Sequence, residues 1–317
     1  MNLPKLAFLF PGQGSQAVGM GKELAALYPV ARHTFQEADE TLGFSISKLC
    51  FEGPEDQLKM TEITQPAILT ASVAVFRVLQ EKGAAPQYVA GHSLGEYSAH
   101  VAAGTVEFAD AVRVVNKRGR YMQEAVPAGQ GAMAAILAMS LEDLEKVCAD
   151  AAQEEVVSPA NINSPDQIVI SGATAAVQRA ADLAKERGAK RAIILPVSAP
   201  FHCALMQAAQ DRLATDLQSA EFSTPEVPVI SNIDAEPKTE AASSRDALIS
   251  QVTGAVQWLG CVRRLIALGA TTFVEVGPGK VLTGLMRQID RNQTAMNVED
   301  EASLQKVTGL FAAAAKD

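Results

Sequence analysis

A serine flanked by glycines, Ser93 in the stretch GHSLG (91–95), is the first candidate for chemistry in this sequence. A short apolar run precedes it and a helical pattern follows it. A G-x-S-x-G motif presents a nucleophile in this strand, turn and helix context. The turn can hold the Ser93 hydroxyl at the carboxyl end of the strand, where ligands bind in open α/β sheets. The alternative is a tight turn whose serine caps the next helix.

A nucleophilic serine needs a base within hydrogen-bonding reach, and the chain has four histidines. His92 is next to Ser93, but adjacent side chains diverge on a sharp turn. His100 lies roughly 10 Å further along the following helix. His33 falls in an early helical pattern, where a solvated or core-edge histidine is expected. His202 lies in a loop after a predicted strand and is the leading candidate for the base, with a purely structural histidine as the alternative.

A second glycine-rich stretch, LFPGQGSQAVGMG (9–21), follows the first predicted strand. It fits the dinucleotide-binding fingerprint loosely, but that site needs an acidic residue at the end of a second strand about twenty positions on. Glu37 and Asp39 fall in a helical pattern instead. The stretch GPGK (277–280) lacks the spacing and the hydroxyl residue of a phosphate loop. Neither stretch therefore predicts a nucleotide site.

The remaining use of the first glycine-rich stretch is geometric. Gly12 and Gly14 let the main chain approach a ligand closely. The main-chain N–H of Gln13 can then point into the site, and the N–H of Leu94 lies at a helix N-terminus. Two such donors are the usual complement of an oxyanion hole.

Short β-rich runs alternate with amphipathic helical stretches, which indicates an α/β protein with a largely parallel sheet. The expected strands are 5–10, 88–91, 227–231 and 271–277. The expected helices are 22–41, 66–82, 94–103, 109–125, 203–219, 245–268 and 280–289.

Between Pro127 and Pro196 the pattern changes to strand, helix, strand, strand, helix, strand. This β-α-β-β-α-β order is that of a ferredoxin-like unit. The economical interpretation is an insertion between two halves of a larger domain. Asn161 and Asn163 fall at the junction of the two parts and are expected to be turn or hinge residues first and site residues second.

Composition excludes several classes of protein. The 317 residues are 48% hydrophobic, which is enough for one large domain carrying a smaller one. The formal charge of -9 argues against a general nucleic-acid binder. The four cysteines are scattered without a CxxC pair, so no disulfide framework or zinc site is indicated and a cytoplasmic location fits best. No continuous apolar run is long enough to span a membrane, and no signal peptide is recognisable.

Several stretches along the whole chain together resemble the bacterial malonyl-CoA:acyl carrier protein transacylases. The resemblance implies an α/β-hydrolase-like core over 1–126 and 198–317 with a ferredoxin-like insertion over 127–197. It is carried by FPGQGSQ (10–16), TQPA (64–67), GHSLGEYSA (91–99), NKRGRYMQEAVP (116–127), NINSPDQIVISG (161–172), PVSAPFHC (196–203) and EVGPGKVLTGL (275–285).

The resemblance also implies a mechanism and its residues. Ser93 would attack the thioester of malonyl-CoA with His202 as base, and the thiol of holo acyl carrier protein would then take the malonyl group in ping-pong order. Gln13 and Leu94 would supply the oxyanion hole. A main-chain carbonyl, matching Gln251, would orient His202 in place of a carboxylate. Family members commonly have Asn-Pro after this position, where this chain reads VTGAVQW (252–258).

The same resemblance makes Arg118 the candidate that selects malonate. Taken alone, an arginine in a helix between Lys117 and Arg120 would be one more solvated cation. A guanidinium can, however, bind the planar malonyl carboxylate with two charge-assisted hydrogen bonds. Met122, Leu94 and Phe201 are expected to form apolar walls. No metal and no cofactor is implied.

Two alternatives and several partner expectations stay open. A serine hydrolase would use the same elbow with water as acceptor, and a related acyltransferase would load polyketide carrier domains. The family resemblance implies malonyl-CoA and an acidic carrier protein as partners. The net charge and the lack of a long apolar run predict no nucleic-acid or membrane partner, and a monomer is expected. Docking cations are expected among Lys185, Arg187, Lys190, Arg191, Arg287 and Arg291.

Overall fold

A six-stranded sheet forms the centre of the larger part of the molecule. The computed structural model describes residues 5–197 and 199–314. The strand order is β10-β9-β1-β2-β7-β8, and all pairs are parallel except β7 with β8. These strands are β1 (Lys5–Phe10), β2 (Tyr88–Gly91), β7 (Val229–Ile230), β8 (Pro237–Lys238), β9 (Ala270–Val276) and β10 (Thr294–Val298).

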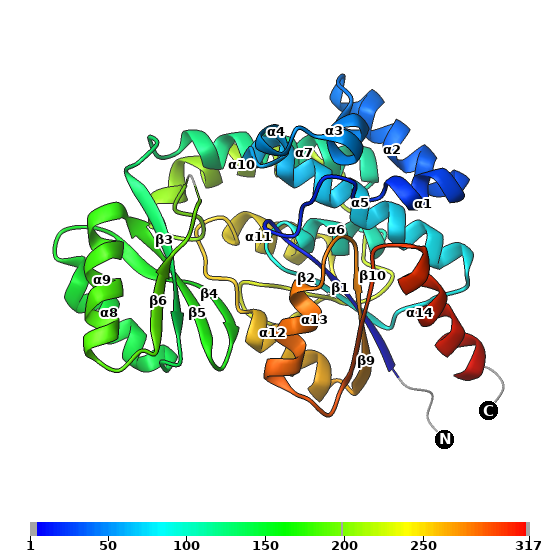
Figure 1. The fold of residues 1–317 in the computed structure, drawn as a ribbon. Helices are drawn as coiled ribbons and strands as arrows, with labels where there is room; N and C mark the ends of the chain where they lie inside the picture. Colours follow the sequence, from blue (N-terminus) through cyan, green and yellow to red (C-terminus); the bar gives the residue numbers. More distant parts are fainter. Residues whose placement is uncertain (1–4, 198, 315–317) are drawn as a thin grey trace.

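Helices cover both faces of this sheet, as a parallel sheet requires (Figure 1). Successive side chains of β1 point to opposite faces. Phe8 and Phe10 both meet Phe76 edge to face, with ring centroids 6.3 and 6.2 Å apart. On the other face, Leu9 belongs to the core cluster of Trp258. Every side chain of β1 after Lys5 is therefore buried.

The helices of the larger part run in chain order between and beyond the strands. They are α1 (Lys22–Leu27), α2 (Pro29–Leu42), α3 (Ile46–Glu52), α4 (Glu55–Leu58), α5 (Thr61–Glu81), α6 (Gly95–Ala102), α7 (Phe108–Glu124), the 3-10 turn η1 (Ala204–Met206), α10 (Gln207–Ser219), α11 (Ala241–Ser250), α12 (Trp258–Ala267), α13 (Val281–Ile289) and α14 (Glu301–Ala314).

A second, antiparallel sheet makes up the smaller part, in green in Figure 1. Its strand order is β4-β5-β3-β6, which is ferredoxin-like. The strands are β3 (Gly131–Leu137), β4 (Val157–Ser164), β5 (Gln167–Ala173) and β6 (Arg191–Ile194), and α8 (Leu141–Ala152) and α9 (Thr174–Glu186) cover the face turned away from the core. The predicted fold class is confirmed, while the boundaries 126/127 and 197/198 stay predictions.

Helix α5 begins at Thr61, five residues before the predicted start, and runs through Pro66. A proline inside a helix cannot donate to the carbonyl four residues earlier, which here belongs to Glu62. The side chain of Asn116 donates to that oxygen instead, at 2.9 Å. By length and composition α5 could also span a membrane, but 83% of its most apolar window is buried inside the protein, as in a core helix.

Two predicted helices are wrong in their continuity. The stretch 22–41 is two helices, because Tyr28 before Pro29 takes the extended conformation that a following proline favours. The stretch 245–268 is also two helices, α11 and α12. Between them Val256 pairs with β4, accepting from the N–H of Ile162 at 2.9 Å and donating to the carbonyl of Ala160 at 2.8 Å. This pairing pulls 251–257 out of helical conformation.

Candidate active site

The turn after β2 holds Ser93 in a strained conformation. Its φ is 52°, in the left-handed region that non-glycine residues rarely adopt. The two flanking glycines are sterically required. A Cβ on Gly91 would lie 1.9 Å from the carbonyl carbon of Gly95, and a Cβ on Gly95 would lie 2.1 Å from the carbonyl oxygen of Phe10. The predicted elbow is therefore present, with the Ser93 side chain held out of the turn.

His202 is the histidine that reaches the serine. The Ser93 Oγ lies 2.7 Å from Nε2 of His202, and Nδ1 of His202 lies 2.9 Å from the main-chain carbonyl of Gln251. A carbonyl only accepts, so Nδ1 carries the proton and Nε2 is free to accept from the serine. Burial, and then the nearby Arg118 guanidinium, lower the pKa of His202 to about 3. The imidazole is thus neutral and able to act as a base.

The other three histidines do not bond Ser93. Nε2 of His92 lies 2.8 Å from Oδ1 of Asn163, so its ring points away from the serine. His100 is fully buried in α6, and His33 is exposed on α2. Asn163 and Asn161 lie within β4, so the expectation of a turn or hinge at these positions is wrong.

Arg118 is buried, with 1% of its surface exposed, and its guanidinium reaches the nucleophile. It donates to Oε1 of Gln65 at 2.8 Å, to Oε1 of Gln251 at 2.9 Å and to Oγ of Ser93 at 3.2 Å. Among the described residues no carboxylate lies within ion-pairing distance of it. Burial lowers the pKa of Arg118. A buried cation without an anion favours an anionic ligand.

A glycine lets α7 bring Arg118 this close. A Cβ on Gly119 would lie 2.6 Å from the carbonyl oxygen of Thr61, so only glycine allows this approach to α5. Gln65 was not singled out from the sequence, although it lies within TQPA (64–67) next to the unusual helical proline. The contact joins residues 53 positions apart, which no local pattern reveals.

The elbow and the first glycine-rich loop lie side by side because the carboxyl ends of parallel strands share one edge of a sheet. Phe10 of β1 pairs with Gly91 of β2. A Cβ on Gly12 would lie 2.4 Å from the carbonyl oxygen of His92. The main-chain N–H groups of Gln13 and Leu94 donate to no other described residue, so both are available to a ligand.

The side chain of Asn232, two residues after β7, supports the elbow. Its Oδ1 accepts from the main-chain N–H of Ser93 at 2.7 Å, and its Nδ2 donates to the carbonyl of Gly91 at 2.7 Å. Asn232 is not among the residues predicted from the sequence. Its position could have indicated it, because Asn232 directly follows the predicted strand 227–231 and so lies at the same edge of the sheet as Ser93.

These groups surround one cavity of about 130 Å³. All the predicted site residues line it except Gln251, which lies behind His202. The predicted residues that line it are Gln13, Ser93, Leu94, Arg118, Met122, Phe201 and His202, and the lining is completed by Gln65, His92, Met133, Asn161, Leu195 and Val197.

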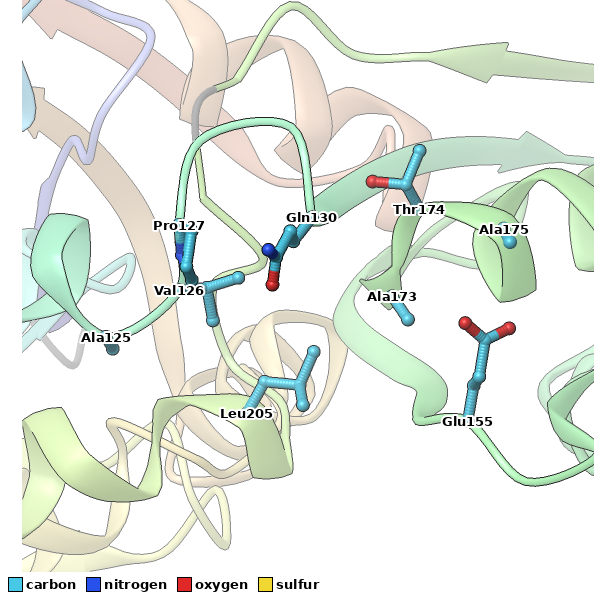
Figure 2. A pocket seen from close by; sticks show the side chains of 9 residues that line it. All are labelled: Ala125, Val126, Pro127, Gln130, Glu155, Ala173, Thr174, Ala175 and Leu205. Carbon is cyan, nitrogen blue, oxygen red and sulfur yellow. The ribbon is translucent and has the colours of Figure 1, made fainter.

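A larger cavity, of about 550 Å³, lies between the end of α7 and the smaller part (Figure 2). Glu155 is the ionisable side chain among the residues described around it, and its carboxylate already pairs with Arg179 at 2.8 Å. The nucleophile and base both lie elsewhere. The chemistry therefore belongs to the smaller cavity.

Comparison with known proteins agrees with this geometry. The acyl transferase domain family matches residues 7–313. The malonyl CoA-acyl carrier protein transacylases of Salmonella typhimurium and Bacillus subtilis are 51% and 50% identical, over 95% and 96% of this chain and 98% and 96% of theirs.

Solved structures show the same similarity. An acyl carrier protein S-malonyltransferase from Vibrio cholerae superposes with a TM-score of 0.94 at 52% identity, covering 96% of this chain and 99% of its own. A malonyl-transacylase in complex with a type II PKS acyl-carrier protein superposes with a TM-score of 0.95 at 47% identity, with the same two coverages.

Proposed function

The chain belongs to the acyl transferase domain family and, within it, to the malonyl CoA-acyl carrier protein transacylases. From this premise we propose that it moves a malonyl group from malonyl-CoA to the phosphopantetheine thiol of holo acyl carrier protein. The observation that carries the proposal is the Ser93 Oγ shared between a neutral histidine at 2.7 Å and a buried, anion-free arginine at 3.2 Å. This pairing suits an acyl group that ends in a carboxylate.

In the first half-reaction the Ser93 Oγ attacks the thioester carbonyl while Nε2 of His202 takes its proton. The main-chain N–H groups of Gln13 and Leu94 hold the resulting oxyanion. When the intermediate collapses, the C–S bond breaks and His202 returns the proton to the leaving CoA thiolate. A malonyl ester on Ser93 remains.

The second half-reaction runs the same steps with the carrier thiol as nucleophile. His202 accepts the thiol proton, sulfur attacks the ester carbonyl, and the proton passes to the departing Ser93 oxygen. The same two donors hold the second oxyanion, and each such donor is worth about 2.7–4 kcal/mol of barrier. The Gln251 carbonyl, 2.9 Å from Nδ1, keeps His202 in the required tautomer throughout.

Arg118 binds the malonyl carboxylate in this proposal. Its Nη2 lies 3.2 Å from the attacking Oγ of Ser93. This closeness suits a malonyl group, in which a single methylene separates the carboxylate from the reacting carbonyl. Met122 and Phe201 line the same cavity and shape the apolar walls beside the acyl chain. A cation in a water-poor site strongly favours malonyl over an uncharged acyl group.

Intact-mass measurement tests this function. Mixing the protein with malonyl-CoA should add the mass of one malonyl group, and holo carrier protein should then remove it. An adduct that water clears without the carrier would indicate a serine hydrolase. Absence of any adduct would overturn the proposal.

The pathway served is a second, related question. One similar solved structure is a malonyl-transacylase bound to a polyketide carrier, so a polyketide role is the alternative to fatty acid synthesis. Comparing kcat/KM for carriers of the two kinds distinguishes these roles. We further propose that the enzyme is a monomer in the cytoplasm; the cavity is lined on all sides by residues of a single chain, and four buried, free cysteines suit a reducing compartment.

A further inference from the structure

Glu96 is a buried carboxyl that the proposed mechanism does not use. It lies in α6, three residues after Ser93, with none of its surface exposed. Its Oε2 accepts two hydrogen bonds, from Nε2 of Gln251 at 2.7 Å and from the main-chain N–H of Asn232 at 3.0 Å. No cation of the described chain forms an ion pair with it. A buried carboxyl of this kind needs a reason to be there.

Gln251 is the residue through which Glu96 reaches the site. Its main-chain oxygen accepts from Nδ1 of His202 at 2.9 Å, and its side-chain Oε1 accepts from Arg118 at 2.9 Å. Its Nε2 donates to Glu96 and also to the main-chain carbonyl of Ser93, at 3.0 Å. One residue thus contacts the base, the selector and the elbow.

The two ends of an amide are not equivalent, and the shortest contact of Nε2 is the one to Glu96, at 2.7 Å against 3.0 Å to the Ser93 carbonyl. With Nε2 held by Glu96, only Oε1 can face Arg118, as the guanidinium requires of an acceptor. With the amide turned round, N–H groups would face the guanidinium and an oxygen would face the carboxyl. The acceptor at position 96 therefore strengthens the one useful orientation of the Gln251 side chain, together with the Ser93 carbonyl and Oδ1 of Asn232 at 3.4 Å.

The main chain around Gln251 does not fix the orientation of its side chain, so the side-chain hydrogen bonds must do so. It follows the last residue of α11 and its N–H still donates to the carbonyl of Ala247 at 2.9 Å, and the chain leaves helical conformation after it, over 252–257. The main chain next bonds an element other than α11 at Val256, which pairs with β4. Between these points the side chain of Gln251 ties the segment to α6.

We propose that Glu96 is a positioning residue that orients Gln251 and thereby aligns Arg118 with the malonyl carboxylate. This inference rests on the proposed malonyl transfer and deepens it. Both hydrogen bonds end on one oxygen, so an uncharged acceptor can replace the carboxyl. Burial raises the pKa of Glu96 to about 7. This agrees with a carboxyl that acts as a hydrogen-bond acceptor rather than as a negative charge.

The test compares Glu96→Gln and Glu96→Leu by kcat/KM for malonyl-CoA and for acetyl-CoA. The glutamine carbonyl can accept both bonds, so Glu96→Gln should keep the wild-type preference for malonyl within about twofold. Glu96→Leu keeps the volume but no acceptor, and should reduce the preference by about 10- to 100-fold, mostly through malonyl. Equal losses for the two substrates would overturn the proposal.

A buried carboxyl elsewhere provides the matched control. Glu275 is also fully buried and accepts from the N–H groups of Leu282 and Thr283 at 3.0 and 2.8 Å, at the start of α13. Glu275→Gln should change the melting temperature without changing the malonyl-to-acetyl ratio. If it changes that ratio as Glu96→Leu does, the effect is general loosening and the proposal fails.

A double-mutant cycle with Gln251→Leu closes the argument. Gln251→Leu removes the amide and keeps the main-chain carbonyl, so the double variant should be no worse than the poorer single variant. Additive losses would overturn the coupling. If Glu96→Leu does not fold, Glu96→Asp replaces it in the test. The aspartate is too short to accept from both donors, so this variant should lose preference for malonyl-CoA over acetyl-CoA. An unchanged preference would refute the proposal. The wild-type adduct with malonyl-CoA reports separately on the proposed function.

Discussion

Two side chains, those of His202 and Arg118, meet at the Oγ of Ser93. Its hydroxyl donates to Nε2 of His202 at 2.7 Å and accepts from Arg118 at 3.2 Å. The guanidinium favours negative charge on this oxygen and also helps to lower the pKa of His202. A malonyl carboxylate beside Arg118 would neutralise that cation. The base should therefore be strongest when the correct substrate is bound.

Replacing the two reacting side chains should give different losses. Ser93→Ala should abolish the malonyl adduct, whereas His202→Ala should still acylate, about 10³-fold more slowly, because the oxyanion donors remain. Rapid-quench intact mass measures both rates. The control is His33→Gln, an exposed histidine on α2 that should acylate like wild type. A His202→Ala variant as fast as wild type would contradict the assignment of the base.

Arg118→Ala should affect malonyl far more than acetyl. Loss of charge-assisted hydrogen bonds worth about 1.5–3 kcal/mol each implies a fall of about 10²-fold or more in kcat/KM for malonyl-CoA. Arg118→Lys should recover part of this, since it keeps the charge and loses the fork. Arg113→Ala, on the same helix but exposed and paired with Asp110, is the control. Equal losses for the two substrates would assign Arg118 a structural role.

At the scale of elements, the sequence predicted what local pattern encodes and missed what distant contacts impose. The elbow was predictable because Gly91, Ser93 and Gly95 lie together between a strand and a helix. The break at 251–257 was not, because it depends on Val256 pairing with a strand almost a hundred residues earlier. The sequence likewise placed the start of a helix at Pro66, whereas α5 begins at Thr61, because Asn116, fifty residues later, bonds the carbonyl that the proline leaves without a donor.

Helix α6 carries an unusual buried histidine. Neither ring nitrogen of His100 has a hydrogen-bond partner among the described residues, and burial lowers its pKa to about 3. The unfolded chain, with a histidine pKa near 6.5, binds the proton more readily, so this histidine destabilises the fold as the pH falls below about 6.5 towards 3.

His100→Leu should therefore stabilise the protein, and more so in acid. Removing the titration alone is worth about 2 kcal/mol at pH 5 and little at pH 7.5. Urea unfolding at both pH values measures the difference. His33→Gln provides the control, because this side chain is exposed on α2. A stability gain that is the same at both pH values would contradict the buried, neutral state of His100.

At the scale of the whole molecule, the smaller part is tied directly to the site. Its edge strand β4 pairs with Val256, and its Asn163 bonds His92 beside the nucleophile. Gln288 of α13 accepts from Ser164, at the end of the same strand, at 2.9 Å. The sequence predicted this part as an insertion, but not that its edge would complete the catalytic segment, since single residues on distant elements make these contacts.

The structure also divides the six cations expected to dock the carrier protein. Lys185 and Arg187 already pair with Asp182 and Asp150, at 3.3 and 2.6 Å. The other four are exposed and form no ion pair with any described residue; they are Lys190, Arg191, Arg287 and Arg291. These four are free to meet the acidic carrier that the family resemblance implies.

Carrier binding should therefore depend on salt and on the unpaired cations in particular. Screening of exposed charges should raise the KM for holo carrier protein as ionic strength increases, and leave the KM for malonyl-CoA less affected. The double variant Lys190→Ala/Arg191→Ala should raise the carrier KM about three- to tenfold at low salt, because each exposed charge contributes about 0.2–1 kcal/mol. Lys185→Ala/Arg187→Ala, whose charges are already neutralised within the chain, should raise it less. Steady-state kinetics of both double variants at low and high salt measure these differences. A carrier KM that does not change with salt would contradict electrostatic docking.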